Sequence, residues 1–339
     1  MEDFNEKFEQ FFTTENQLSL YRFSLPLTKA IDFKGHKLTS REGLWLVKRN
    51  ANAEQLIGEI SPLPGFSQET LAQCEQQLLT LLHTQTEIMP ENLFPSVNFA
   101  LFCLDQKIPY EKTQNKTPQL ISIPLLQGSP CDILSRYQAL NYPNKVKLKV
   151  ARQPVSKDIQ TLQDLIKLNP NVIFRLDANQ QWTTQQYNEF LKQINSKHLD
   201  YIEEPTASLQ DNINISEQFN VAIGLDESLL SEHIIPIHDC IKALIIKPTL
   251  IGCPSKIQSL LKHAQKQQLS ISVSASFESP LALNQLSNLA QQWQTQYQLE
   301  VSLGLDTMHV FQNQYFKTTS PAKNLLSVLL SEATCLWHH

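Results

Sequence analysis

The sequence predicts an α/β protein whose larger part is a (β/α) barrel and whose smaller, N-terminal part is an α+β unit. Three observations predict the barrel. From Ile121 to Gly304, short hydrophobic segments alternate with stretches of helical polarity. The polar residues that end five of these segments lie 28, 26, 23 and 21 positions apart, which suits one strand plus one helix. The chain has eight glycines and no glycine-rich phosphate loop, which disfavours a doubly wound open sheet.

The composition predicts a substantial hydrophobic core and no affinity for polyanions. The chain has 339 residues, 41% of them hydrophobic, and a formal net charge of -5, so neither nucleic acid nor an anionic membrane is expected as a partner. No apolar run approaches the roughly 20 residues that span a bilayer. The acidic start Met1-Glu2-Asp3 lacks the apolar stretch of a secretory signal, so we expect a cytoplasmic protein. The six cysteines form no CxxC pair and are expected to be free thiols.

The N-terminal part is expected to be an α+β unit over residues 18–108, preceded by an extension, residues 1–17, with no recognisable chemistry. Extended segments are predicted at Leu20–Phe23, Gly43–Val47 and Ile57–Ile60, and helices at 70–83 and 95–104. Between the third strand and the first helix, Ser61–Ser67 contains two prolines, Gly65 and Phe66. This loop is predicted to act as a lid over a substrate.

The barrel is expected to have eight strands, and the second of them carries two lysines. The predicted strands are Ile121–Leu126, Val146–Val150, Val172–Asp177, Tyr201–Pro205, Val221–Asp226, Ala243–Pro248, Ser270–Ser274 and Glu300–Gly304. Alternation places Lys147 and Lys149 on one face of their strand. Taken alone, this segment favours an antiparallel strand with a wet face, because paired ammonium groups resist burial. The downstream series of polar strand ends favours the barrel instead.

Asp177, Glu203, Asp226 and Lys247 each end a hydrophobic run, at the C-terminal end of a predicted strand. In a barrel these ends converge on one mouth, where catalysis occurs in this architecture. Three carboxylates brought together repel one another unless a cation lies among them. Oxygen ligands without His or Cys favour a hard ion, and Mg²⁺ is the best candidate. A single carboxylate at the end of a strand is usually a helix cap or a solvated turn residue. Three of them at the ends of successive strands make that interpretation much weaker.

A divalent cation flanked by two lysines suits the removal of a proton from the carbon next to a carboxylate. That step creates a dianionic enediolate, whose charge the cation and a preorganised ammonium group offset. The base has to be neutral near pH 7. Burial, the neighbouring Lys147 and the cation all lower the pKa of Lys149, so Lys149 is the predicted base.

Several motifs carry a resemblance to a known family. They are Gly58–Thr70 (GEISPLPGFSQET), Lys147-x-Lys149, Arg175–Asn179 (RLDAN), Glu203-Glu204-Pro205, Leu225–Leu229 (LDESL), Ile246–Leu250 (IKPTL) and Gly304–Thr307 (GLDT). In this order they resemble the enolase superfamily, in its muconate-lactonizing-type subgroup, and within it the o-succinylbenzoate synthase family. The resemblance runs from about residue 18 to at least Thr307.

The resemblance implies an enolase-like α/β fold in which an α+β capping domain covers a modified TIM barrel, (β/α)7β. The barrel and its catalytic site are expected over residues 119–305, with residues 306–339 returning to the capping domain. The implied enzyme is a lyase of menaquinone biosynthesis, which uses Mg²⁺, with Mn²⁺ as a substitute. It catalyses the syn dehydration of 2-succinyl-6-hydroxy-2,4-cyclohexadiene-1-carboxylate to 2-succinylbenzoate.

The resemblance also implies a role for individual residues. Lys149 removes the ring proton and then protonates the leaving hydroxyl, and Lys247 stabilises the enediolate from across the ring. Asp177, Glu203 and Asp226 hold the metal, with Glu204 behind them. Substrate-binding or supporting roles fall to Lys147, Arg175, Asn179, Ser274, Ser276, Gly304 and, in the lid, Pro64, Gly65, Phe66 and Ser67. Ala275 interrupts a serine run common in the family, and Pro280 follows, so the succinyl-tail region departs from the family pattern.

Two alternatives remain beside this interpretation. An N-acylamino acid racemase or dipeptide epimerase of the same superfamily would use the same lysines as opposed bases, although the Ser61–Ser67 loop favours the synthase. A barrel that has lost catalysis and binds a partner is the alternative of another class, and the presence of all five polar markers argues against it. The expected partner is a small-molecule carboxylate substrate.

Overall fold

The computed structural model describes residues 17–33, 35–50, 54–84, 90–111, 120–231, 235–312 and 325–338. The predicted N-terminal extension lies outside these ranges except for Gln17. Within them, no helix combines the length and the apolar character that crossing a lipid bilayer requires.

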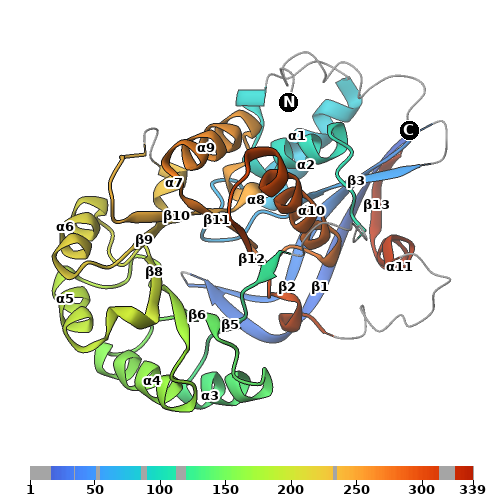
Figure 1. Cartoon of the computed structure of the whole chain (residues 1–339). Helices are drawn as coiled ribbons and strands as arrows, with labels where there is room; N and C mark the ends of the chain where they lie inside the picture. Colours follow the sequence, from blue (N-terminus) through green and yellow to red (C-terminus); the bar gives the residue numbers. More distant parts are fainter. Residues whose placement is uncertain are drawn as a thin grey trace.

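An antiparallel sheet forms the first part of the structure (Figure 1). Its strands, in spatial order, are β13 (Thr334–His338), β1 (Gln17–Phe33), β2 (His36–Arg49) and β3 (Gln55–Ile60). The C-terminal strand therefore pairs with the first strand of the chain. Two helices, α1 (Leu71–Thr84) and α2 (Pro95–Asp105), accompany this sheet, together with the short 3₁₀ helix η3 (Pro90–Asn92).

The hairpin of β1 and β2 is much longer than the predicted extended segments. Its outer half lacks regular alternation and contains Pro26, so local propensity does not reveal it. Contacts with the segment after the barrel hold it in place. The Thr28 hydroxyl donates to the carbonyl of Val310, the amide of Gln312 donates to Pro26, and Leu27 forms an isolated bridge with Phe311. These contacts carry the hairpin tip to the mouth of the barrel.

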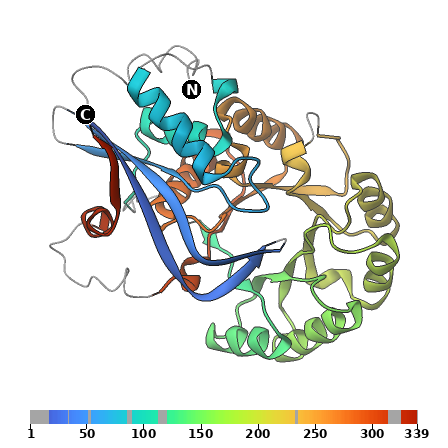
Figure 2. The same cartoon turned by 180° about the vertical axis from the view of Figure 1, so that it is seen from behind.

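The second sheet is parallel and closes on itself (Figure 2). Its strands, in spatial order, are β4 (Ile121–Ser122), β12 (Val301–Gly304), β11 (Ser270–Ser274), β10 (Ile241–Ile246), β9 (Ile223–Leu225), β8 (Leu199–Glu203), β7 (Ile173–Asp177), β6 (Lys145–Lys149) and β5 (Leu125–Leu126). β4 and β5 belong to one extended stretch. Pro124, which has no N–H, separates them, so β4 pairs with β12 and β5 pairs with β6. This stretch closes the barrel, and the predicted fold class is confirmed.

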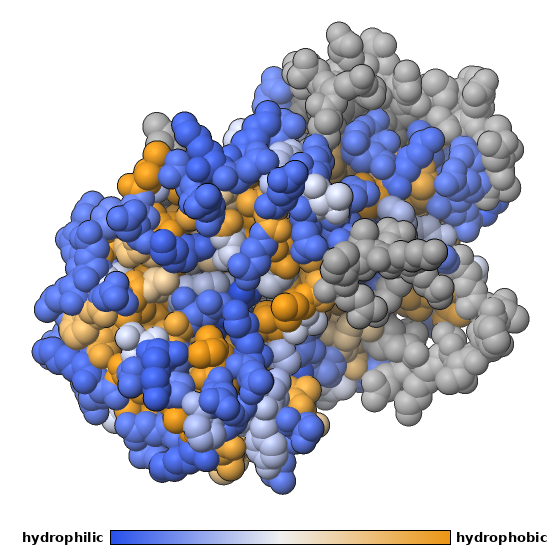
Figure 3. All heavy atoms as spheres, viewed as in Figure 1, coloured by the Kyte–Doolittle hydropathy of each residue, from blue (hydrophilic) through white to orange (hydrophobic). Residues whose placement is uncertain are grey.

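The barrel helices lie outside the strands and cover them (Figures 1 and 2). They are α3 (Pro130–Ala139), α4 (Val155–Leu168), α5 (Thr184–Gln193), α6 (Leu209–Phe219), α7 (Ser228–Ser231), α8 (Pro248–Ile251), α9 (Pro254–Gln267) and α10 (Pro280–Tyr297). Three further elements are η4 (Ser196–His198), η5 (Met308–Val310) and α11 (Leu325–Ser331). The face of the molecule seen in Figure 3 is mainly hydrophilic, with patches of hydrophobic atoms among the hydrophilic ones.

The lysine strand β6 shows how the sequence directs side chains in this barrel. Val146 and Leu148 are buried in the hydrophobic layer between the strands and α3 and α4. Lys147 and Lys149 alternate with them and point to the barrel interior, as the period of a strand requires. The wet antiparallel face that this segment alone favours is therefore wrong. The two lysines can lie in the barrel interior because carboxylates from the neighbouring strands pair with them.

Close backbone contacts join the first sheet to the barrel. A Cβ atom on Gly58 of β3 would lie 2.4 Å from the carbonyl oxygen of Ala100 in α2, and one on Gly252 would lie 2.2 Å from the Cα of Pro95. Only glycine allows α2 to pack this tightly between β3 and α8. From α10, the buried Gln285 side chain donates to the carbonyls of Ile57 and Ile108. The two parts of the chain thus share one packed interface.

Candidate active site

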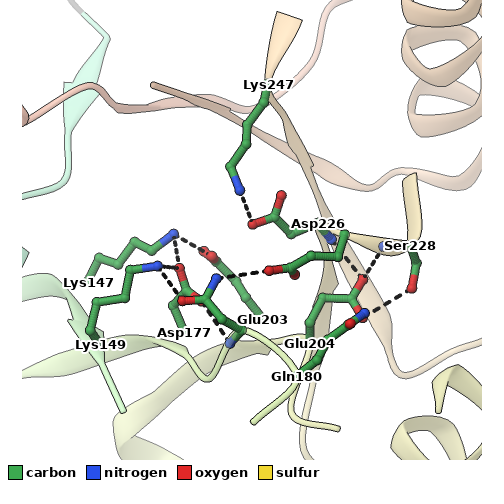
Figure 4. A network of polar contacts seen from close by, with 11 residues as sticks. Lys147, Lys149, Asp177, Gln180, Glu203, Glu204, Asp226, Ser228 and Lys247 are labelled. Carbon is green, nitrogen blue, oxygen red and sulfur yellow. Dashed lines mark hydrogen bonds and ion pairs between the residues drawn. The ribbon is translucent and has the colours of Figure 1, made fainter. Parts of the chain in front are cut away.

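Three carboxylates meet at the C-terminal ends of β7, β8 and β9 (Figure 4). Asp177 and Glu203 are the last residues of their strands, and Asp226 follows β9 directly. One oxygen from each lies within 4.8 Å of the others, and the three residues are no more than 2% exposed. Among the residues that the structure describes, this is the one group of three acidic, His or Cys residues with such convergence.

Three lysines surround this cluster (Figure 4). The Nζ of Lys147 lies 2.8 Å from Oδ2 of Asp177 and also donates to Oε2 of Glu203. The Nζ of Lys149 lies 2.6 Å from the same Asp177 oxygen, and that of Lys247 lies 2.5 Å from Oδ2 of Asp226. Three acidic and three basic side chains therefore face one another in a largely buried site.

The two lysines of β6 differ in pKa because their surroundings differ. Burial lowers the pKa of Lys147, but the charges of Asp177 and Glu203 outweigh it and hold this pKa well above its usual value. For Lys149, burial is the largest effect. Asp177 opposes it, while Lys147 and Lys247 add to it, so the pKa of Lys149 is lowered. This is the direction predicted from the sequence.

Glu203 shows that the carboxylate cluster has room for another positive charge. Burial, followed by the like charges of Asp177 and Asp226, raises the pKa of Glu203 to about 8 although Lys147 pairs with it. Its Oε1 is buried and has no hydrogen-bond partner among the described residues. An oxygen-only donor set with a free buried oxygen fits a hard divalent cation.

Behind the cluster, Glu204 fixes the loop that carries Asp226. Its Oε1 accepts hydrogen bonds from the amides of Asp226 (3.0 Å) and Ser228 (2.9 Å), and its Oε2 accepts from the Ser228 hydroxyl and from Gln180. The backbone of Glu204 has a φ of 38°, which turns the side chain away from that of Glu203. Consecutive glutamates thus face different partners.

Asn179 and Glu227 connect the base to the metal side of the site. Oδ1 of Asn179 accepts from Nζ of Lys149 at 2.7 Å, and its Nδ2 donates to Oε1 of Glu227 at 2.9 Å. Burial, then the charge of Asp226, raises the pKa of Glu227 to about 7. The sequence predicts no role for Glu227. Its position inside the Leu225–Leu229 motif was the one available signal.

The cluster opens into a pocket between the barrel mouth and the first sheet. Leu63 and Phe66 from the lid, Ile31 from the hairpin, and Leu250 provide apolar walls. Lys147, Lys149, Asp177, Asn179 and Lys247 line it from the barrel. A mostly apolar pocket with a few convergent charged groups is typical of a binding site for a small organic acid.

Both parts of the chain match known families. Residues 15–108 match the family described as MenC, N-terminal domain, and residues 134–323 match the family described as Enolase C-terminal domain-like. The o-succinylbenzoate synthase of Yersinia enterocolitica is 32% identical over 332 residues, which cover 94% of this chain and 98% of the relative. The synthase of Aliivibrio fischeri strain MJ11 is 30% identical over 333 residues with the same coverage. The chain belongs to the o-succinylbenzoate synthase family. It is therefore an enzyme of the lyase class.

Solved structures confirm the fold but do not separate activities within it. The o-succinylbenzoate synthase of Thermosynechococcus elongatus, a structure with magnesium in the active site, has a TM-score of 0.67 and 20% identity, and covers 87% of this chain and 94% of that chain. The L-Ala-D/L-Glu epimerase of Bacillus subtilis has a TM-score of 0.69 and 15% identity, with coverage of 87% and 90%. The family assignment therefore depends on the full-length relatives.

Apart from Arg175, the remaining predicted substrate-binding residues of this family member fall into two groups. Ser274, Ser276, Gly304 and Phe66 line the pocket. Pro64, Gly65 and Ser67 instead border a separate groove on the outer face of the lid. The lid is a tight turn: Gly65 has a φ of 82°, and the amides of Phe66 and Ser67 donate to the carbonyl of Leu63.

Arg175 lies beneath the site and does not line the pocket. Its Nε donates to Asp200 at 2.8 Å, its Nη1 donates to the Ser302 hydroxyl, and its guanidinium lies 4.8 Å from the ring centroid of Tyr201. These contacts fill the barrel interior below Glu203. Arg175 therefore supports the carboxylates from below.

Further pocket residues were not predicted as site residues from the sequence. They are Ile31, Leu63, Ile123, Leu125, Gln127, Arg152, Leu250, Phe277, Asp306 and Thr307. Asp306 and Thr307 belong to the Gly304–Thr307 motif, which was a usable signal. Leu63 and Leu250 lie in the Gly58–Thr70 and Ile246–Leu250 motifs, and the rest reach the pocket through the packing of separate elements.

Proposed function

We propose that this chain catalyses the syn dehydration of 2-succinyl-6-hydroxy-2,4-cyclohexadiene-1-carboxylate to 2-succinylbenzoate, with Mg²⁺ held by Asp177, Glu203 and Asp226. One observation carries the proposal. Lys149 and Lys247 stand at opposite points of the barrel mouth: β7, β8 and β9 separate β6 from β10 on one side, and β11, β12 and the β4–β5 stretch on the other. A planar ring between the two ammonium groups would have one lysine on each face.

The metal and the lysines would have different roles in the reaction. Bound Mg²⁺ would offset the charge that develops on the substrate carboxylate when the neighbouring carbon loses its proton. Lys149, as a neutral amine, would accept that proton at Nζ. The C–H electrons then form the new ring double bond, the C–O bond breaks, and the Lys149 ammonium returns the proton to the departing hydroxyl as water. One base on one face accounts for syn stereochemistry.

Lys247 would act from the opposite face as a cation. Burial lowers its pKa, but Asp226, Glu227 and Asp177 outweigh burial and raise it, so this amine stays protonated. Its Nζ lies 6.0 Å from the ring centroid of Phe66 in the lid. Phe66 would exclude water from the reacting face, and the lower local polarity strengthens the attraction between the ammonium and the developing charge.

We further propose that the enzyme acts in the cytoplasm on a free small molecule. Mn²⁺ shares the oxygen-ligand preference of Mg²⁺, so we expect it to support turnover.

The test is an ultraviolet assay for the aromatic product with purified enzyme, with and without EDTA. We expect turnover that EDTA abolishes and Mg²⁺ restores. Lys149→Ala should lower kcat at least about 100-fold with an unchanged circular dichroism spectrum, because it removes the general base. Lys145→Ala, on the same strand but paired with Asp200, is the matched control and should stay within a few fold of the parent.

Two results would contradict the proposal. Substantial dehydration by Lys149→Ala would place the base elsewhere. Exchange of the α-proton of N-acyl amino acids in deuterated water, without any dehydration, would favour a racemase or epimerase of the same superfamily.

A further inference from the structure

The barrel mouth has two chemically different halves. The half formed by β7, β8 and β9 holds the three carboxylates, and the lysines at the ends of β6 and β10 mark its borders. The opposite half, formed by β11, β12 and the β4–β5 stretch, presents hydroxyl-bearing and apolar residues. A substrate that places one carboxylate at the metal side must extend the rest of its length into this second half.

Two buried hydroxyl groups in the second half lack a partner. Ser276 and Thr307 both line the pocket and are 2% and 4% exposed. In the part of the chain that the structure describes, neither Oγ of Ser276 nor Oγ1 of Thr307 makes a hydrogen bond. A buried hydroxyl without a partner costs free energy, so the two groups are poised for an acceptor that enters the pocket.

The backbone around Thr307 is fixed by the residue before it. Oδ2 of Asp306 accepts from Nη2 of Arg136 at 2.6 Å and from the amide of Leu125 at 3.1 Å. These bonds join the end of β12 to β5 and α3. Thr307 is thereby held at the pocket wall, and the negative charge of Asp306 is already paired.

Arg152 is a cation at the border of this half. It follows β6, is exposed at the mouth and lines the pocket. No hydrogen bond or ion pair joins its guanidinium to another described residue. The three lysines, in contrast, are each bound to carboxylates of the metal half. A second anionic group on the substrate would find its counter-ion here.

We propose that Arg152 and Thr307, beside Ser276, bind the second carboxylate of a dianionic substrate and so set the preference for it. This inference depends on the proposed function, which supplies a substrate with two carboxylates. Arg152 neutralises the distal carboxylate at the rim, and the Thr307 hydroxyl donates to an oxygen of the same side chain. Neither contact would be made to a reacting carbon. They contribute to binding in the ground state and transition state alike, and thus to KM more than to kcat.

The experiment compares Arg152→Met, Thr307→Val and Lys157→Met with the parent in the presence of Mg²⁺. Lys157 is exposed on the following helix and lies outside the pocket, so Lys157→Met removes the same charge nearby. Calorimetry measures binding of 2-succinylbenzoate, which has both carboxylates, and of benzoate, which lacks the tail. Initial rates give KM and kcat for dehydration.

We expect Arg152→Met to weaken 2-succinylbenzoate binding by roughly 10- to 100-fold, the effect of losing a charge-assisted hydrogen bond, and to leave benzoate binding unchanged. Thr307→Val should weaken it about three- to tenfold, as expected for a neutral hydrogen bond. KM should rise in parallel. Equal losses for both ligands, or a loss no larger than that of Lys157→Met, would overturn the inference. Failure of the parent to dehydrate, with the ligand preference intact, would instead refute the proposed function.

Discussion

Replacing Arg41 with Met should strongly destabilise the fold, because this side chain joins the lid to the barrel. Arg41 lies on β2, is 3% exposed, and donates to four backbone carbonyls. The acceptors are Ser61 (2.7 Å) and Pro62 (3.1 Å) at the start of the lid, and Ser276 (3.4 Å) and Phe277 (3.0 Å) after β11. One guanidinium thus holds two pocket-lining segments together.

The expected loss follows from the charges and bonds that remain. Burial lowers the pKa of Arg41, while Glu278 and Glu59 raise it, so both carboxylates lose their cation in the variant. Hydrogen bonds to a charged donor are worth about 1.5–3 kcal/mol each, but the variant also avoids the free-energy cost of burying a guanidinium. Removing one partner of a buried ion pair destabilises a protein by about 3–5 kcal/mol net. We therefore expect Arg41→Met to lower the free energy of unfolding by about 3–5 kcal/mol.

Equilibrium urea unfolding, followed by circular dichroism, measures this change. Arg22→Met is the control: Arg22 pairs with Glu42 and Glu75 on the surface, and exposed ion pairs contribute about 0–1 kcal/mol. A loss of less than about 1 kcal/mol in Arg41→Met would refute the reasoning. If Arg22→Met lowered the free energy of unfolding by as much as Arg41→Met, the loss would not be specific to the buried contacts of Arg41.

Two further predictions concern individual carboxyl groups. Burial raises the pKa of Asp158 from the usual 3.8 to about 6, so its contribution to stability is present at low pH and is lost as pH rises through 6. The difference in unfolding free energy between the parent and Asp158→Asn should therefore fall by up to about 3 kcal/mol from pH 4 to pH 7, and a pH-independent difference would contradict this. Asp226→Asn should weaken Mg²⁺ binding at least about tenfold in a calorimetric titration, because one charged ligand is lost, whereas an unchanged titration would exclude Asp226 as a ligand.

The barrel could be predicted because its local and global signals agree. The barrel strands are short and mostly hydrophobic, and from β7 to β10 a polar residue either ends the strand or follows it directly. Asp177, Glu203 and Lys247 obey this rule, so counting along the chain also predicted which side chains share the mouth. The alternation of β6 was informative for the same reason, although its meaning depended on the neighbouring strands.

Long-range contacts determine the features that the sequence did not reveal. The outer half of the β1–β2 hairpin is extended because it pairs with itself and contacts Phe311, not because its residues favour strands. The β4–β5 stretch was predicted as one strand, and Pro124 divides it between two partners. Thr307 lines the pocket because Asp306 is bound to Arg136, which is 170 positions away. No local pattern encodes such a contact.

The charge of the site links the metal to the substrate. Asp177, Glu203 and Asp226 contribute three carboxyl groups, and Lys147, Lys149 and Lys247 contribute three amino groups, so acidic and basic side chains are matched in number. A divalent cation among the carboxylates would add two positive charges, which a low-polarity site tolerates poorly. A dianionic substrate brings two negative charges and restores the balance. Mg²⁺ would be held by the carboxylate oxygens with which the lysines pair, and its binding would leave the amino groups of the lysines free to face the ring.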